Sequence, residues 1–341
     1  MVQTLPSAKP PPRQQGIALI MVLLIVAVVS IIATETSSRI QFEIQKAQNR
    51  QQYQQASWYA IGAERLARGL IEIAKNDPTI NLDQDWANPY LSYPIDGGSM
   101  TIQILDQQNC FNLNALSSLN TPQASRPTVP LLERQLKQLL VELDADPHQI
   151  LQLVEPLLDW VDNDTLPSGF EGVEDLHYNG LDPAYLPANG PLTDPSELKL
   201  INGFNPSDDA QIELLEQWSP YLCTLPTPDL KVNINTLAEE QAPLLAAILD
   251  GKHSSTDIET ALQSRPDDGF ANVGDFVTLL PVLTPPLSIK LFDHLNVTSE
   301  FFLARIQVRY YDANLILFSQ FKIDPSNQPV TYRRRYGGPN E

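Results

Sequence analysis

One uninterrupted apolar run near the amino terminus constrains this chain more than any other feature. The run extends from Ala18 to Ala33 without a charged residue, and the next charge is Glu35. A helix rises about 1.5 Å per residue, so a run of this length is sufficient, at the short end, to cross the apolar core of a bilayer. Lys9 and Arg13 precede it without an accompanying acid. The positive-inside rule therefore keeps the leader in the cytoplasm and exports the rest of the chain.

Three interpretations of this start compete. A secretory signal peptide has an apolar core of roughly 7–15 residues and a small-x-small cleavage site behind it, whereas residues 34–37 here read Thr-Glu-Thr-Ser. A plain signal anchor fits the hydrophobicity equally well. Gly16, between the basic leader and the apolar run, resembles the end of a type IV prepilin leader, which is cut after the glycine. On this third interpretation the chain is cut between Gly16 and Ile17, residues 1–16 are the leader, and residues 17–34 span the membrane.

The apolar run is predicted to be the first part of one long helix. The chain has 29 prolines, yet none lies between Pro12 and Pro78, and proline inside a helix costs about 3 kcal/mol. Residues 35–77 are therefore predicted to form an amphipathic spine. Its apolar positions recur at intervals of three and four: Ala56, Tyr59, Ala60, Ala63, Leu66, Ala67, Leu70 and Ile73.

Charge and cysteine content narrow the class of protein. The chain has 22 Lys and Arg against 41 Asp and Glu, a net charge of −19, which repels nucleic acid. Cys110 and Cys223 are the only cysteines, and both fall in the exported part, where disulfides persist. We expect them to pair and to stabilise the fold by about 3–5 kcal/mol on the chain-entropy estimate. Two separate buried thiols are the alternative.

The rest of the chain alternates between strand and helix patterns. Residues 78–98 are rich in turn formers and are predicted to be a loop ending in a Gly-Gly turn, and residues 99–105 alternate as a strand does. Helical patterns and helix-start signals follow from Pro130 onward. Two further strand patterns, Phe301 to Tyr311 and Leu315 to Ile323, predict a hairpin.

The predicted fold class is α+β: a long amino-terminal helix with a small antiparallel sheet, interrupted by a large, mostly α inserted domain. In this division the sheet domain takes residues 78–120 and 296–341, and the inserted domain takes residues 121–295.

Several segments together resemble the general secretion pathway protein K family, the large minor pseudopilins of the type II secretion system. They are GIALIMVLLIVAVVSIIA (16–33), CFNLNAL (110–116), LDWVDNDTLPSGFEGVED (158–175), KVNINTL (231–237), NVGDF (272–276) and the terminal hairpin. The resemblance covers essentially the whole length. It implies a pilin-like fold with a large inserted α domain, a structural rather than enzymatic role at the tip of the pseudopilus, and pseudopilins I and J as partners. It also implies other pseudopilins and prepilin peptidase as partners, and a single pass through the Gram-negative inner membrane with the large domain in the periplasm.

Met21 is a departure from most pilins that fits this resemblance. Counted from Ile17, it is the fifth mature residue, where most pilins and pseudopilins carry a glutamate. That glutamate offsets the buried amino terminus of a neighbour in the filament, a charge that is costly in lipid. A subunit at the tip has no neighbour above it to satisfy. Met21 therefore agrees with a tip subunit.

The most site-like stretch is an acidic loop, residues 159–182. Seven acids lie in it, and no Lys or Arg occurs between Lys137 and Lys199, so the carboxylates repel one another unless a cation neutralises them. Carboxylate oxygens on an irregular loop suit Ca²⁺, which takes six to eight oxygen ligands, and the resemblance implies calcium here, one or two ions. First choices as ligands are Asp162, Asp164, Glu174 and Asp175, followed by Asp159, Glu171 and Asp182. A solvated acidic loop without a metal is the alternative.

A membrane-tethered, exported DNA receptor is the rival function. FNLNAL (111–116) and VNINTL (232–237) are near copies, and the second resembles helix–hairpin–helix segments that bind DNA phosphates. Only Lys231, Lys252 and Arg265 are basic between residues 231 and 270, a balance that disfavours phosphate binding. The run Arg333-Arg334-Arg335 is interpreted as part of a solvated tail. We find no catalytic motif and predict no enzyme activity and no nucleic-acid partner.

Overall fold

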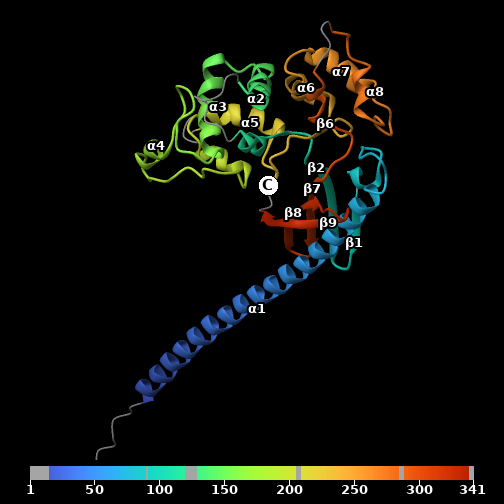
Figure 1. Ribbon diagram of the computed structural model, residues 1–341. Helices are drawn as coiled ribbons and strands as arrows, with labels where there is room; N and C mark the ends of the chain where they lie inside the picture. The colour runs from blue at the N-terminus through green and yellow to red at the C-terminus, as the bar shows by residue number, and fades with distance from the viewer. Residues whose placement is uncertain (1–14, 90, 120–128, 205–208, 284–287, 338–341) are drawn as a thin grey trace, which may run out of the picture.

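The computed structural model describes residues 15–89, 91–119, 129–204, 209–283 and 288–337 (Figure 1). The chain begins with α1 (Gln15–Ala74), a single helix of 60 residues, as the absence of proline predicted. Residues 17–51 of α1 are all exposed, and this half extends away from the rest of the molecule as a rod. Among the described residues, α1 is the one helix that is long and apolar enough to cross a membrane.

A five-stranded antiparallel sheet packs on the second half of α1. Its order is β1-β2-β7-β8-β9, and its strands are β1 (Leu91–Ile95), β2 (Gly98–Asp106), β7 (Phe301–Tyr310), β8 (Ala313–Ile323) and β9 (Pro329–Gly337). A short 3-10 turn, η1 (Asp85–Ala87), buries Trp86 beside it. The predicted antiparallel sheet with its terminal hairpin is therefore confirmed, with two more strands than expected.

The two extra strands correct two predictions. Residues 91–95 were expected in a loop, but they pair with β2, and Gly97 (φ +82°) makes the turn between the two strands. The run Arg333 to Arg335 was expected in a solvated tail, but it lies in β9. Arg334 forms an ion pair with Glu64 of α1, and Arg333 forms one with Asp194. The acidic partners of these two arginines are distant in the sequence, so the local pattern could not reveal them.

The helix contacts the sheet through an alanine stripe. Ala56, Ala60, Ala63 and Ala67 are fully buried, and together with Ile71 they join Ile102, Ile306 and Leu317 in one apolar core. Small side chains let the helix axis approach the sheet closely. Leu66 and Ile73, expected on the same face, are 44% and 63% exposed, so the buried stripe is narrower than the apolar pattern suggested.

The inserted part leaves and re-enters the sheet at neighbouring points, because Asp106 at the end of β2 lies opposite Phe302 in β7. It forms two lobes above the sheet (Figure 1). The first lobe contains β3 (Phe111–Asn112), η2 (Leu113–Ser118), α2 (Leu131–Glu142), α3 (Pro147–Val161), α4 (Asp175–Asn179), η4 (Pro195–Leu200), α5 (Asp209–Trp218), η5 (Ser219–Tyr221) and β4 (Leu222–Cys223). The second lobe contains β5 (Val232–Asn233), η6 (Glu239–Gln241), α6 (Ala242–Ile248), α7 (Ser255–Gln263), α8 (Val273–Val277), α9 (Ile289–Phe292) and β6 (Leu295–Asn296).

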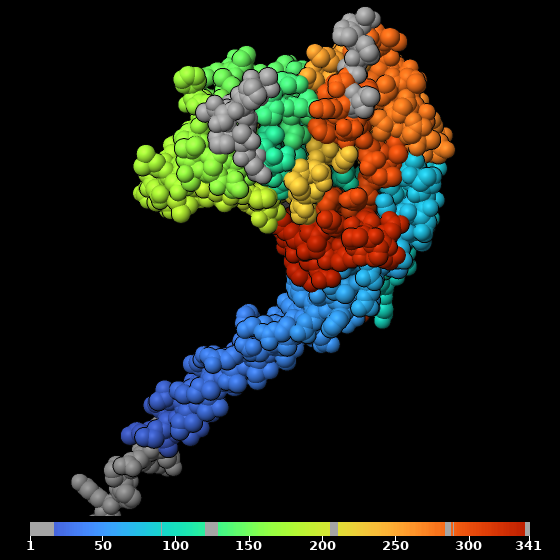
Figure 2. Space-filling view, in the orientation of Figure 1, coloured from blue at the N-terminus to red at the C-terminus, as the bar shows by residue number. Residues whose placement is uncertain are grey.

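The two lobes share one apolar core, in which α2 packs against α6. Phe111, Leu113 and Leu116 belong to this core, although the predicted division placed residues 78–120 with the sheet. Packing therefore starts the insertion soon after Asp106. The first lobe overhangs the rod of α1 and leaves an open concave face between them (Figure 2).

The near copies FNLNAL and VNINTL perform the same structural task in the two lobes. Asn112 donates to Thr227 O and Asp229 O, and Asn114 donates to Leu192 O and Leu225 O. In the second copy Asn233 donates to Ile80 O, and Asn235 donates to Phe270 O. Each buried amide satisfies backbone carbonyls of a neighbouring loop, which would otherwise be costly to bury. These buried asparagines hold the neighbouring loops in place through their hydrogen bonds, and we call them clamp residues.

Candidate functional site

The candidate site is built on the carboxyl-terminal half of α3. Glu155, Asp159 and Asp162 follow one another at intervals of four and three residues, so they share one face of the helix and the residue that ends it. The carboxyl end of a helix carries partial negative charge, which disfavours carboxylates. All three side chains are nevertheless buried, at 5%, 0% and 7% exposure. The arrangement therefore requires compensating donors or a cation.

Two of these acids hold the acidic loop by its backbone. Glu155 Oε2 accepts hydrogen bonds from Phe170 N (2.9 Å) and Glu171 N (2.8 Å), and Asp159 Oδ1 accepts from Ser168 N (2.8 Å). Gly169 has φ +65°, and a side chain there would strike the Glu155 carboxylate. Glu155 was not predicted as a site residue, although its four-residue spacing from Asp159 was the available signal.

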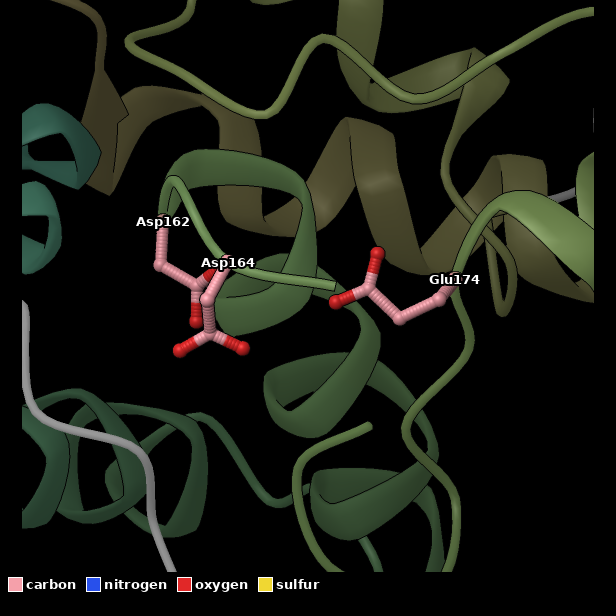
Figure 3. Close-up of side chains that lie close together, drawn as sticks. All are labelled: Asp162, Asp164 and Glu174. Carbon is pink, nitrogen blue, oxygen red and sulfur yellow. The ribbon is translucent and has the colours of Figure 1, made fainter. Parts of the chain in front are cut away.

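Three carboxylates meet where the acidic loop closes. One oxygen from each of Asp162, Asp164 and Glu174 lies within 4.8 Å of the others. Figure 3 shows the Glu174 carboxylate pointing toward the two aspartates from the far end of the loop. Asp162 and Glu174 are buried, and Asp164 is half-buried. We call these three residues the carboxylate triad.

Glu174 is the member of the triad whose carboxylate has no hydrogen-bond donor among the described protein atoms. Both carboxylate oxygens of Glu174 and Oδ2 of Asp159 are buried without a hydrogen-bond partner. Burial raises the pKa of Glu174 to about 8, and repulsion from Asp159, Asp162 and Asp164 adds to the rise. Burial also raises the pKa of Asp159 to about 7, against the hydrogen bonds from Ser168. Carboxylates crowded in this way bind a proton or a cation more readily than isolated ones.

The triad fits a hard cation such as Ca²⁺. Oxygens that each lie about 2.3–2.6 Å from one ion can be separated by up to about twice that distance, which includes the 4.8 Å limit. The remaining ligands would come from water, backbone carbonyls and Asp159 Oδ2. Asp162, Asp164 and Glu174 were predicted ligands that the structure brings together.

The other predicted ligands are not part of this group. Glu171 lies in the middle of the loop and Asp182 is exposed beyond α4. Asp175 follows Glu174 directly and starts α4. It is close enough to raise the pKa of Glu174, but it is not among the three carboxylates that meet. Asp159 lies beside the triad, close enough to raise the pKa of Glu174.

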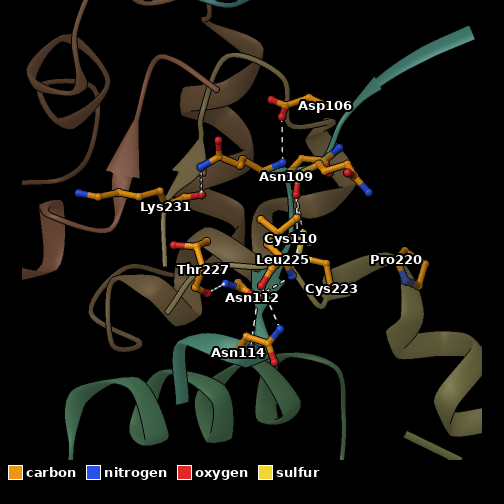
Figure 4. Close-up of a disulfide and its surroundings, with 12 residues drawn as sticks. Asp106, Asn109, Cys110, Asn112, Asn114, Pro220, Cys223, Leu225, Thr227 and Lys231 are labelled. Atoms are coloured by element: carbon orange, nitrogen blue, oxygen red, sulfur yellow. Dashed lines mark hydrogen bonds between the residues drawn. A yellow bond between two sulfur atoms is a disulfide. The ribbon is translucent and has the colours of Figure 1, made fainter. Parts of the chain in front are cut away.

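The two cysteines form a disulfide that joins Cys110, directly before β3, to Cys223 in β4 (Figure 4). Their Cα atoms are 5.8 Å apart across a sequence separation of 113 residues. The bond closes the first lobe at its base, next to the clamp residues Asn112 and Asn114. It therefore ties the two ends of the lobe that carries the triad.

The predicted processing site lies at the start of α1. Residues 1–14 fall outside the described part of the chain, so the leader prediction is not tested by the structure. Ile17 and Met21 are 62% and 61% exposed among apolar neighbours. An apolar surface of this extent needs lipid or other helices around it.

Known proteins share both the sequence and the fold of this chain. Two family models, both described as type II secretion system protein K, match residues 109–227 and 232–297. The chain is 35% identical over 334 residues to type II secretion system protein K of Aeromonas hydrophila, across 96% of this chain and 98% of that protein. It is also 35% identical to the Klebsiella pneumoniae protein of the same name, across 89% of this chain and 92% of that protein.

A solved structure extends the likeness to three dimensions. It is the crystal structure of the GspK-GspI-GspJ complex from the type 2 secretion system of enterotoxigenic Escherichia coli. The matching chain has a TM-score of 0.72 and 28% sequence identity, over 86% of this chain and 99% of that chain.

Proposed function

Because the chain belongs to the type II secretion system protein K family, we propose that it is a structural minor pseudopilin at the tip of the periplasmic pseudopilus, assembled with pseudopilins I and J. It would support export of folded proteins across the outer membrane without a catalytic step of its own. The observation that carries the proposal is the architecture. A 60-residue helix is exposed along residues 17–51 and packs against a sheet along its second half. The exposed half is therefore available to lipid and to other subunits.

The proposed location is the inner membrane, with one pass and the large domain in the periplasm. The apolar exposed half of α1 supports the anchor, and the positions of Lys9 and Arg13 support the orientation. The Cys110–Cys223 disulfide agrees with an oxidising compartment. Cleavage by prepilin peptidase between Gly16 and Ile17 is part of the proposal. The mass of the amino-terminal peptide from membranes tests it: a start at Ile17 supports it, and an intact leader contradicts it.

Assembly at the tip is tested through the exposed face of the spine, which lies between about Gln41 and Arg68. Trp58 is 72% exposed on this face, between the buried Ala56 and Ala60, so Trp58→Asp should leave the fold intact and weaken co-purification with pseudopilins I and J. Val282→Asp is the matched control, because Val282 is 96% exposed but lies in the second lobe. Failure of the unmodified chain to co-purify with I and J would contradict the assembly.

The triad is proposed to bind Ca²⁺, one or two ions, and thereby to stiffen the first lobe. The uncompensated carboxylate oxygens of Glu174 support this assignment. When bound, the ion supplies positive charge that lets Asp162, Asp164 and Glu174 stay ionised together. Calcium titration by calorimetry is the test: Glu174→Gln should abolish high-affinity binding. Asp182→Asn, an exposed acid of the same loop outside the triad, should leave binding unchanged. Equal binding by both variants would contradict the assignment.

The DNA-receptor alternative has no support in the described part of the chain. Arg265 donates to Ile234 O and Leu237 O, and Lys231 Nζ donates to Asp293 O. Both cations are therefore engaged with backbone carbonyls inside the second lobe, where they order loops. The near copies that suggested a DNA-binding motif supply the clamp residues instead.

A further inference from the structure

The acidic loop exposes large apolar side chains to a degree that packing does not explain. Phe170 has a relative exposure of 103%, and Leu176 is 90% exposed. Each is next to an acid in the sequence, since Glu171 follows Phe170 and Asp175 precedes Leu176. A fully exposed apolar side chain on an ordered segment can anchor a protein partner, because burying it in the complex removes its apolar area from water.

The exposure of Phe170 is built into the loop. Its backbone N–H donates to the buried Glu155 carboxylate, as does that of Glu171. Gly169 gives the chain the positive φ that turns it over this carboxylate, and Ser168 is held by Asp159. The segment is therefore fixed with the Phe170 side chain facing outward, so little conformational freedom is lost when a partner covers it.

The charge around these side chains selects the partner. Seven acids lie in residues 159–182, and no Lys or Arg occurs between Lys137 and Lys199. A divalent ion on the triad offsets only two of the seven negative charges, so the surface stays acidic. An anionic lipid surface would be repelled. A second copy of this chain, with a net charge of −19, is disfavoured as well, because two acidic surfaces repel each other.

We propose that Phe170 and Leu176 are the anchors of a docking surface for a protein that presents an apolar pocket bordered by Lys or Arg. The surface lies at the outer edge of the first lobe around α4, away from the sheet (Figure 1). It goes beyond the proposed assembly with I and J, which uses the spine. The apolar anchors supply affinity, and the surrounding carboxylates supply the approach rate and the selection for a cationic rim.

The first test places the photoreactive residue p-benzoylphenylalanine at position 170 of the full-length chain in secreting cells. The same residue at position 282 is the control, because Val282 is 96% exposed but lies outside the acidic loop. We expect at least tenfold more adduct from position 170, joined to a partner peptide rich in Lys or Arg and apolar residues. Adduct no greater than at position 282, or adduct to lipid, to an acidic peptide or to another copy of this chain, would overturn the proposal.

The second test measures affinity for the protein that carries the cross-linked peptide, after its purification. The double variant Phe170→Ser/Leu176→Ser should raise the Kd at least tenfold, and Val282→Ser should change it less than twofold. Affinity of the unmodified chain should fall as salt is raised. An unchanged Kd in the double variant would overturn the proposal. Co-purification with pseudopilins I and J, measured on the same variants, should not change, so failure of the docking surface is distinguishable from failure of the assembly.

Discussion

Buried acids occur in both parts of the molecule, but Glu64 of the sheet body and Glu174 of the first lobe differ in whether hydrogen-bond donors surround them. In the sheet body, Glu64 accepts from Ser319 Oγ (2.7 Å) and Thr331 Oγ1 (3.1 Å), and from Arg334 Nε (2.6 Å) and Nη2 (2.8 Å). These donors lower the pKa of Glu64 despite its burial. In the first lobe, Glu174 has no such donor, and its pKa is raised to about 8.

The difference between the two acids lies in the hydrogen-bond donors around each buried carboxylate. Asp106, at the end of β2, is 6% exposed, as Glu174 is, yet both of its oxygens accept hydrogen bonds. Burial raises the pKa of Asp106, and these hydrogen bonds oppose the rise. Gln108 N donates to Oδ1, and Asn233, Thr236 and Ser299 donate to Oδ2. Glu64 and Asp106 are therefore satisfied by side chains of this chain, whereas Glu174 of the first lobe needs a cation or a proton to neutralise it.

Removing the proposed calcium ion should have the largest effect, and only on the first lobe. At calcium concentrations of about 100–1,000 times the Kd, binding contributes about 3–4 kcal/mol to the free energy of unfolding. Adding a chelator should therefore lower the hydrogen-exchange protection of residues 155–180, while residues 56–74 of α1 keep theirs. Equal loss of hydrogen-exchange protection in both regions would show that calcium stabilises the whole molecule and not the first lobe alone.

In the metal-free protein, a rise in pH should destabilise the first lobe. The ordinary pKa of a glutamate is 4.5, and that of Glu174 in the folded lobe is about 8, so between these values the folded lobe holds a proton that the unfolded chain has released. Its stability is complete below pH 4.5 and is lost as the pH rises toward 8. One such proton is worth about 2–3 kcal/mol over two pH units.

Glu64 in the sheet body should behave oppositely. The stability that Glu64 contributes is present above pH 4.5, its ordinary pKa, and is lost only as the pH falls through the lowered pKa of the folded state. Protection factors measured by hydrogen exchange at pH 5 and pH 7 should thus fall for residues 155–180 and stay constant for residues 56–74. Parallel slopes in the two regions would contradict the contrast.

Glu64→Ala should destabilise the body by about 2 kcal/mol, less than a fully buried pair because Arg334 is half exposed. The loss arises because Ser319, Thr331 and Arg334 lose their shared acceptor. It should be the same with and without calcium when measured by urea unfolding. Glu72→Ala is the matched control, since Glu72 is an exposed acid on the same helix and should change the free energy of unfolding by less than about 0.5 kcal/mol.

Arg333→Ala should have the smallest effect, about 0.5 kcal/mol, because the pair with Asp194 is partly exposed. This pair is a contact between β9 and the first lobe, so the substitution tests how far the two parts are coupled. Raised salt should weaken the pair in the unmodified chain and leave the variant unaffected. A loss well above 1 kcal/mol would show that the lobe depends on the sheet for its stability.

Sequence patterns predicted the long elements well, because each has a strong local cause. The proline-free interval and its apolar run fixed α1, and alternation fixed the hairpin of β7 and β8. β1 was missed because Pro94 and the turn formers around it dominate its five residues. β9 was missed because its three arginines look solvated until Glu64 and Asp194, far away in sequence, are brought beside them.

The sequence predicted that the candidate site is an acidic loop, but it did not predict which acids of the loop meet. The acidic loop was evident from its charge, and three of the four first-choice ligands meet in the triad. Asp175 is next to Glu174 in the sequence but starts α4 and lies outside the triad, a distinction that the local pattern does not encode. The loop-holding role of Glu155 depends on a turn over Gly169 that no local pattern encodes.

The register between β2 and β7 has a consequence for how such a chain can change over generations. Asp106 and Phe302 are neighbours across two paired strands, so the residues between them form a side branch whose two ends are already adjacent. That branch can lengthen, shorten or exchange its loops without moving a strand of the sheet or a turn of the spine. The two parts of one gene product are therefore free to diverge at different rates.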